Sequence, residues 1–282
     1  MGEKLAGASN VSAICVYAVV DHRFSQTFDG FAPLHCKHFI INTFYRRRII
    51  NLVTVPVVSP RIVGGQATNI NSYPHIASLQ HRYYLFFWYH ECSGTIITSR
   101  AILTSAYCLD GWGADKWRAS VGSSYSGSGG TKYRIASIVI HPRFNRGAIT
   151  NDIAIMRTSI LMTFTNLVQP ARIPPNPNFV VENNKPVEAA GWGPIYYGGN
   201  VVSQLRRVEM NSINQTVCAL RYNLLGKVIT ENMLCAGLLD VGGRGTCGED
   251  AGGPVYYKAC ANRRNGRLIF PDILQLHHHH HL

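Results

Sequence analysis

The chain has 282 residues, of which 46% are hydrophobic and 15% are charged. This balance excludes a disordered chain and allows one or two domains with a buried core. The net charge of +12 is spread along the chain without a basic and aromatic cluster, so nucleic acid is not an expected partner. No apolar run reaches the roughly 20 residues that a membrane-spanning helix needs, so a membrane is not expected either.

Residues 1–61 form a leader that precedes the readable part of the chain. An apolar run at 11–20 has the length of the hydrophobic region of a secretion signal. Its cleavage site is weak, because the one small residue near its end, Ala18, lies between larger side chains. Consecutive arginines at 46–48 suit either a processing protease or a solvated turn. We expect a weak signal peptide followed by a propeptide of low order, and hence a secreted, extracellular protein.

The cysteines indicate an oxidising compartment. No two of them have the short C-x-x-C spacing of a zinc site or a redox motif. An even number of cysteines in a chain of this kind predicts a disulfide framework. They are Cys15, Cys36, Cys92, Cys108, Cys218, Cys235, Cys247 and Cys260.

Short apolar runs predict a β protein. Between residues 74 and 165 such runs alternate with glycine, serine, asparagine and proline. This spacing favours an antiparallel barrel. A strand is also expected in the second half of the chain, so that the expected strands include 75–79, 94–98, 135–140, 153–156 and 205–208.

Five stretches of sequence carry a resemblance to one enzyme family. Arg-Ile-Val-Gly-Gly stands at 61–65, and the stretch at 92–108 ends in Thr-Ser-Ala-Tyr-Cys. Asn-Asp-Ile-Ala-Ile-Met covers 151–156, and Ala-Ala-Gly-Trp-Gly covers 189–193. Gly-Thr-Cys-Gly-Glu-Asp-Ala-Gly-Gly-Pro covers 245–254. In combination they resemble the trypsin-like serine proteases of the S1 family over about residues 61–256. Arg-Ala-Ile-Leu-Thr at 100–104, Asn-Met-Leu-Cys at 232–235 and Gly-Gly-Arg at 242–244 resemble insect digestive trypsins in particular.

The resemblance implies an all-β fold of two antiparallel six-stranded barrels. It implies a protease-like domain at 62–258, and a digestive lumen is one location that it suggests. After Pro254 the family pattern is lost, so the second barrel is expected to be truncated at its C-terminal end. Residues 259–282 are expected to be a divergent tail that ends in a histidine tract. The family pattern also implies the disulfide pairs Cys92–Cys108, Cys218–Cys235 and Cys247–Cys260.

The positions that match the catalytic triad of the family are mostly substituted. The family aspartate is present as Asp152, but Tyr107 stands at the histidine position and Ala251 at the serine position. A neutral phenol with a pKa of about 10 is a poor general base. A methyl group cannot attack a carbonyl carbon. The resemblance therefore predicts a serine protease homologue without proteolytic activity.

Two further positions differ from an active trypsin. Glu249 stands where the family has the glycine whose amide forms part of the oxyanion hole, and Gly245 stands where trypsins have the aspartate of the specificity pocket. The activation residues are kept, because Arg61 precedes Ile62, and Asp250 is the expected partner of the ammonium group that cleavage after Arg61 would create. Such a buried ammonium group requires a carboxylate partner.

We expect no cofactor and no metal. The family calcium loop falls within 116–151, which contains no aspartate or glutamate. Asn214 begins an Asn-Gln-Thr sequon and is a candidate for glycosylation. The expected partner is a protease, a protease inhibitor or another secreted protein. Two alternatives stay open at this point: a working trypsin-like endopeptidase, and a degenerate gene product without a selected role.

Overall fold

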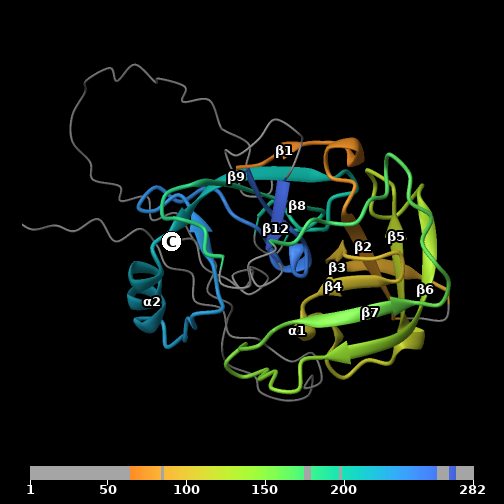
Figure 1. Cartoon of the computed structure of the whole chain (residues 1–282), viewed down its shortest axis with the longest axis horizontal. Coiled ribbons are helices and arrows are strands. Elements are labelled where there is room, and N and C mark those ends of the chain that lie inside the picture. Colours follow the sequence, from red (N-terminus) through yellow and green to blue (C-terminus); the bar gives the residue numbers. More distant parts are fainter. Residues whose placement is uncertain (1–63, 84–85, 175–178, 197–198, 259–266, 271–282) are drawn as a thin grey trace, which may run out of the picture. The chain divides into compact units, whose positions relative to one another are not determined.

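The computed structural model describes residues 64–83, 86–174, 179–196 and 199–258, together with the backbone of 267–270 (Figure 1). All of these residues belong to one of two compact units of the chain, the unit that comprises 1–16 and 60–282. Several predicted features lie outside the described residues: the signal segment, Arg61, Ile62, Cys15, Cys36, Cys260 and the histidine tract.

The first half of the protease-like region forms a closed antiparallel barrel, as predicted. Its strand order is β2-β3-β4-β7-β6-β5. Along β5, the inward-facing Trp117, Ala119 and Val121 are buried, which is the two-residue period of a strand with one face in a core. The six strands are β2 (Ile76–Arg82), β3 (Trp88–Ile96), β4 (Ala101–Thr104), β5 (Trp117–Val121), β6 (Thr131–Ile140) and β7 (Ala154–Thr158).

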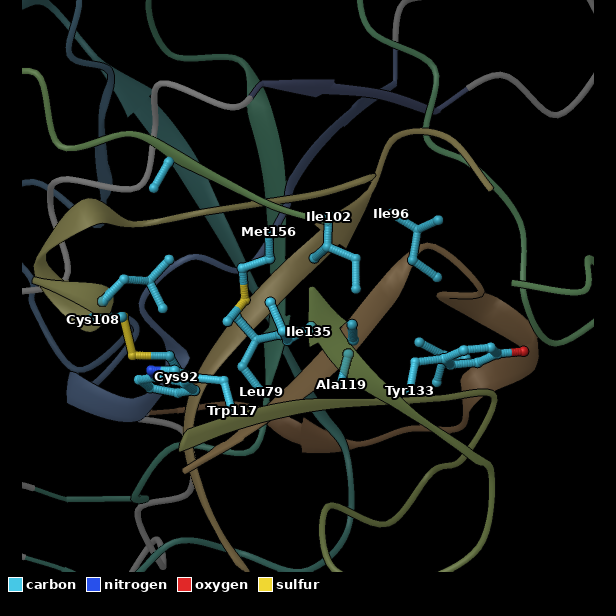
Figure 2. Close-up of a cluster of buried hydrophobic side chains, with 14 of the residues drawn as sticks. Leu79, Cys92, Ile96, Ile102, Cys108, Trp117, Ala119, Tyr133, Ile135 and Met156 are labelled. Carbon is cyan, nitrogen blue, oxygen red and sulfur yellow. A yellow bond between two sulfur atoms is a disulfide. The ribbon is translucent and has the colours of Figure 1, made fainter. Parts of the chain in front are cut away.

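The interior of this barrel is filled by side chains from every strand (Figure 2). Leu79, Ile102 and Met156 are fully buried there. At about 25 cal/mol per Å² of apolar surface, each fully buried side chain of this size contributes roughly 2 kcal/mol before entropy is counted. The barrel core is therefore a rigid base for the loops at its ends.

A β-bulge interrupts the pairing of β2 with β3. Leu79 pairs with Cys92, but the next residue, Gln80, pairs with His90. Glu91 is therefore the additional residue of β3. A bulge of this kind bends its strand and redirects a side chain.

The second sheet also has six strands, in the order β1-β9-β8-β11-β12, with β10 paired to β9. Within the described residues this sheet is open, whereas the first sheet closes. The last strand, Arg-Leu-Ile-Phe at 267–270, pairs with β11 inside the expected tail, and its β-branched and aromatic residues favour a strand. The strands are β1 (Gln66–Ala67), β8 (Pro186–Gly191), β9 (Arg206–Ile213), β10 (Cys235–Gly237), β11 (Val255–Lys258) and β12 (Arg267–Phe270).

Helices are short in this fold. They are α1 (Ala106–Leu109) and α2 (Gln215–Asn223), with single 3-10 turns η1 (Ile70–Ser72), η2 (Ala114–Lys116) and η3 (Gly248–Asp250). Of the helices that the structure describes, none has the length and apolar character that a membrane crossing requires.

Two of the predicted disulfides are confirmed. Cys92 of β3 is bonded to Cys108 of α1, and Cys218 of α2 is bonded to Cys235 of β10. Each bond closes a loop of similar length, which stabilises the folded chain by about 3 kcal/mol because it reduces the entropy of the unfolded chain. Cys247 is bonded to no cysteine within the described residues, and the pairing expected for it involves a residue outside them. That third pairing stays a prediction.

Candidate functional site

Asp152 is buried where β7 begins and faces the start of α1. Both of its carboxylate oxygens accept hydrogen bonds from the Ser105 hydroxyl, at 2.8 and 2.7 Å, and Oδ1 accepts another from the Tyr107 amide at 2.6 Å. Burial raises the pKa of Asp152, while these hydrogen bonds oppose the rise. The retained carboxylate thus anchors the first turn of α1. The sequence pattern did not reveal that Ser105 is one of its hydrogen-bond partners.

Tyr107, at the predicted histidine position, directs its ring towards an arginine. The guanidinium carbon of Arg146 lies 4.7 Å from the centre of the Tyr107 ring. Arg146 also forms an ion pair with Asp110 at 3.0 Å. The ring therefore takes part in a cation–π contact, which stabilises exposed pairs by about 0.5–1 kcal/mol.

Ala251, at the predicted serine position, is 2% exposed and packs with the core of the first barrel. Its amide donates a hydrogen bond to the Gly248 carbonyl at 3.1 Å, and its carbonyl accepts one from the Ser93 amide at 2.8 Å. The loop around Ala251 is therefore held through its backbone. The side chain at this position offers no group that reacts with a carbonyl carbon.

Glu249, at the predicted oxyanion-hole position, is tied to β3 by a buried histidine. The Glu249 carbonyl lies 3.1 Å from Nε2 of His90, and Nδ1 of His90 lies 2.8 Å from the Ser78 hydroxyl. A carbonyl oxygen only accepts, so Nε2 carries the proton and Nδ1 accepts from Ser78. Burial lowers the pKa of His90 to about 4, which agrees with a neutral ring. The sequence reasoning missed this pair, although polar residues in an otherwise buried strand were a visible signal.

Asp250, the predicted partner of the activation terminus, is buried and 1% exposed. Its Oδ1 accepts from the Gly193 amide at 2.7 Å and its Oδ2 from the Cys247 amide at 2.9 Å. Burial raises the pKa of Asp250 to about 6 against these hydrogen bonds. A Cβ atom on Gly191 would lie 2.0 Å from Oδ1 of Asp250, so the glycine keeps room for this side chain.

Gly245, the predicted pocket position, has space around it. A Cβ atom added there would meet no described atom within 4 Å. The structure therefore leaves room for a side chain at this position. No group of three or more histidine, cysteine, aspartate or glutamate residues that could hold a metal occurs within the described part of the chain.

Asp152 and Tyr107 thus meet at the start of α1. Ala251 packs in the same core as Ala106 and Cys108 of α1, and Asp250 is the preceding residue, in η3. A closed six-stranded barrel joined to a second antiparallel sheet, with a disulfide beside the loop around Ala251, is the architecture of a chymotrypsin-type protease domain. The trypsin family model matches residues 62–260. The chain therefore belongs to the trypsin family.

Insect trypsins are among its relatives, as the sequence motifs indicated. The alkaline trypsin C of Manduca sexta is 44% identical over 206 residues, which cover 73% of this chain and 80% of that protein. Achelase-1 of Lonomia achelous is 42% identical over 200 residues, or 70% of this chain and 91% of that protein. Trypsin CFT-1 of Choristoneura fumiferana is 38% identical over 209 residues, which cover 74% of this chain and 81% of that protein.

Proposed function

We propose that this chain is a secreted member of the trypsin family that lacks proteolytic activity and acts by binding another protein. The observation that carries the proposal is the buried methyl group of Ala251 at the position of the family nucleophile. In another serine protease, loss of the triad as a unit lowers turnover by about 10⁶. Two disulfides support an oxidising, extracellular location.

The neighbouring substitutions also argue against proteolytic activity. The Tyr107 ring contacts Arg146, and a phenol is a weak base at neutral pH. Glu249 adds a carboxylate beside the position where negative charge develops in acyl transfer, and a carboxylate there opposes rather than stabilises that charge. Gly245 carries no anion that would hold a substrate lysine or arginine. Restoring one residue would therefore leave the other defects in place.

The activation switch is part of the proposal. Asp250 is buried, with a pKa raised to about 6, and an ammonium group at Ile62 would stabilise its charged form. Cleavage after Arg61 would create that ammonium group. The ion pair between that ammonium group and Asp250 would then order the binding surface, although the protein catalyses no reaction.

The first prediction concerns activity. After cleavage by immobilised trypsin and removal of that trypsin, the chain is expected to hydrolyse arginyl and lysyl amide substrates no faster than the buffer blank. The reason is that no hydroxyl stands at position 251. The measurement is release of a chromogenic amine, with and without a serine-directed covalent inhibitor. Inhibitor-sensitive turnover by the unmodified chain would establish the alternative, a working endopeptidase.

The matched control is a repair series. Tyr107→His with Ala251→Ser is expected to restore little activity, because the pocket and oxyanion positions stay altered. Adding Gly245→Asp and Glu249→Gly to that pair is expected to restore more, since the structure leaves room for a side chain at position 245. Full recovery with the first pair alone would show that the remaining substitutions are harmless.

A further inference from the structure

An exposed group of aromatic side chains surrounds the turn between β2 and β3. We call it the turn face. Phe86 is 82% exposed and Phe87 is 61% exposed. The rings of Tyr83 and Tyr89 lie 6.4 Å apart, and those of Tyr83 and Trp112 lie 6.3 Å apart. Clustered exposed aromatic rings of this kind mark surfaces that bind another molecule. The turn face comprises Tyr83, Phe86, Phe87, Tyr89 and Trp112.

A buried histidine supports this face from below. The ring of His81 lies 4.5 Å from Tyr83, 4.4 Å from Trp112 and 4.8 Å from Trp117, each in an edge-to-face arrangement. His81 is 1% exposed, because it continues the inward-facing row of β2 that includes Leu79. Ring contacts of this geometry hold Tyr83 and Trp112 in place. The face is thus preorganised, which lowers the entropic penalty of binding.

Two carboxylates border the aromatic rings. Glu91 is the additional residue of the β3 bulge, and its carboxyl group lies close enough to the Tyr83 hydroxyl for the pair to lower the pKa of Glu91 against the effect of burial. The Glu249 carbonyl lies 3.1 Å from Nε2 of His90, the residue that precedes Glu91, so the two carboxylates lie near enough to repel. Burial raises the pKa of each carboxyl group, and the charge of Glu91 raises the pKa of Glu249 further. A cation bound beside the two carboxylates would offset both the loss of hydration and the mutual repulsion of their charges.

The basic side chains of this part of the barrel contact groups other than Glu91 and Glu249. Arg118 lies over the Trp88 ring at 4.6 Å and donates to the Gln80 side chain at 2.6 Å. Arg82 and Lys116 each lie 3.7 Å from the Asp115 carboxylate. Within the described residues, no ion pair includes Glu91 or Glu249. In a chain of net charge +12, this acidic border is complementary to a basic partner.

We propose that the turn face and its two carboxylates bind a partner peptide segment through an arginine side chain. A guanidinium group suits this surface because it stacks on aromatic rings and donates paired hydrogen bonds to carboxylates. The proposal rests on the proposed function, since it names the kind of partner that the non-catalytic protein binds. It assigns recognition of the cation to Glu91 and Glu249 rather than to position 245.

The test is isothermal titration calorimetry of the full chain, before and after cleavage at Arg61, with a capped Gly-Ser-Arg-Gly-Arg-Ser peptide. A peptide with both arginines replaced by glutamate is the ligand control. Saturable binding of the arginine peptide alone is expected. Glu91→Gln with Glu249→Gln is expected to weaken it by about tenfold or more, because two charge-assisted hydrogen bonds are lost.

The matched protein control removes the same charge elsewhere. Asp240 and Glu182 are exposed and form ion pairs with Arg221 and Lys185, so Asp240→Asn with Glu182→Gln is expected to change the affinity less than about twofold. Phe86→Ser with Phe87→Ser tests the aromatic part without touching the core and is expected to weaken binding severalfold. Thermal melting of each variant reports whether it is folded.

Each outcome decides the proposal. Equal affinity for the two peptides, no binding by the unmodified chain, or equal loss in both charge variants would overturn it. These outcomes are separate from the activity assay. A chain that hydrolyses amides refutes the proposed function whatever it binds, whereas an inactive chain that ignores the arginine peptide refutes only this inference.

Discussion

Single buried groups decide how the loop at 245–254 is held. Asp250 accepts two backbone hydrogen bonds, and the Ala251 carbonyl accepts a third from Ser93. The Ser93 hydroxyl itself is buried and has no hydrogen-bond partner within the described part. A buried hydroxyl without a partner is destabilising, because it has lost its hydrogen bonds to water.

Ser93→Ala is therefore expected to raise the free energy of unfolding by about 1 kcal/mol. The neighbouring Thr104 hydroxyl supplies the control, since it is buried and donates to the Ser93 carbonyl at 2.8 Å. Thr104→Val removes that bond and is expected to lower the free energy of unfolding by about 1–2 kcal/mol. Urea unfolding followed by fluorescence measures both. A destabilising Ser93→Ala would mean that the hydroxyl has a partner.

At the scale of elements, α2 depends on the residue that precedes it, Asn214. The Asn214 side chain accepts a hydrogen bond from the Val217 amide at 3.1 Å and so caps the helix. The same residue begins the sequon, whose glycan would be attached to the amide nitrogen and would leave the capping oxygen free.

Asn214→Ala is expected to destabilise the chain by about 1 kcal/mol, whereas Asn214→Asp keeps the capping oxygen and is expected to cost little. Both variants remove the sequon, so thermal melting separates capping from glycosylation. If both variants melted equally early, loss of the glycan rather than loss of the cap would be the cause. A mass difference beyond that of the substitution, between the chain that carries Asn214 and either variant, reports whether the site is glycosylated.

Much of the fold was predictable from the chain, and the reasons are local. The barrel strands follow from alternating apolar runs, and the Cys92–Cys108 bond lies within one motif. The Glu91 bulge was not predictable, because it depends on the register that β2 and β3 adopt together. The approach of Glu249 to Glu91 brings together distant parts of the sequence, and no single motif contains both. The pairing of 267–270 with β11 is likewise a tertiary outcome.

At the scale of the whole molecule, the charge of Asp250 links cleavage to stability. Its folded pKa, about 6, is above its ordinary value, so the folded uncleaved chain binds more protons than the unfolded chain. The uncleaved chain is therefore expected to lose stability as pH rises from about 4 to about 6. Cleavage after Arg61 supplies an ammonium partner, lowers that pKa and is expected to weaken or reverse the loss.

Melting temperatures from about pH 4 to about pH 8, before and after cleavage, measure this difference. N-terminal sequencing checks that the new chain begins at Ile62. Burial also raises the pKa values of Asp152, Glu91 and Glu249, but these groups are present in both forms. The comparison therefore reports on Asp250 together with the new amino terminus. Parallel pH profiles would show that the new terminus does not reach Asp250.

The loop at 245–254 bridges the two sheets, and this has a consequence for which of its residues can change. The Ser93 amide and the His90 ring of β3 bind the carbonyls of Ala251 and Glu249, whatever side chains those residues carry. Gly252 has no such freedom: its φ is +83°, and a Cβ atom there would lie 2.1 Å from the Thr104 hydroxyl oxygen. Substitutions at 249, and exchanges between small side chains at the buried position 251, can therefore occur without unfolding the loop, whereas position 252 accepts only glycine.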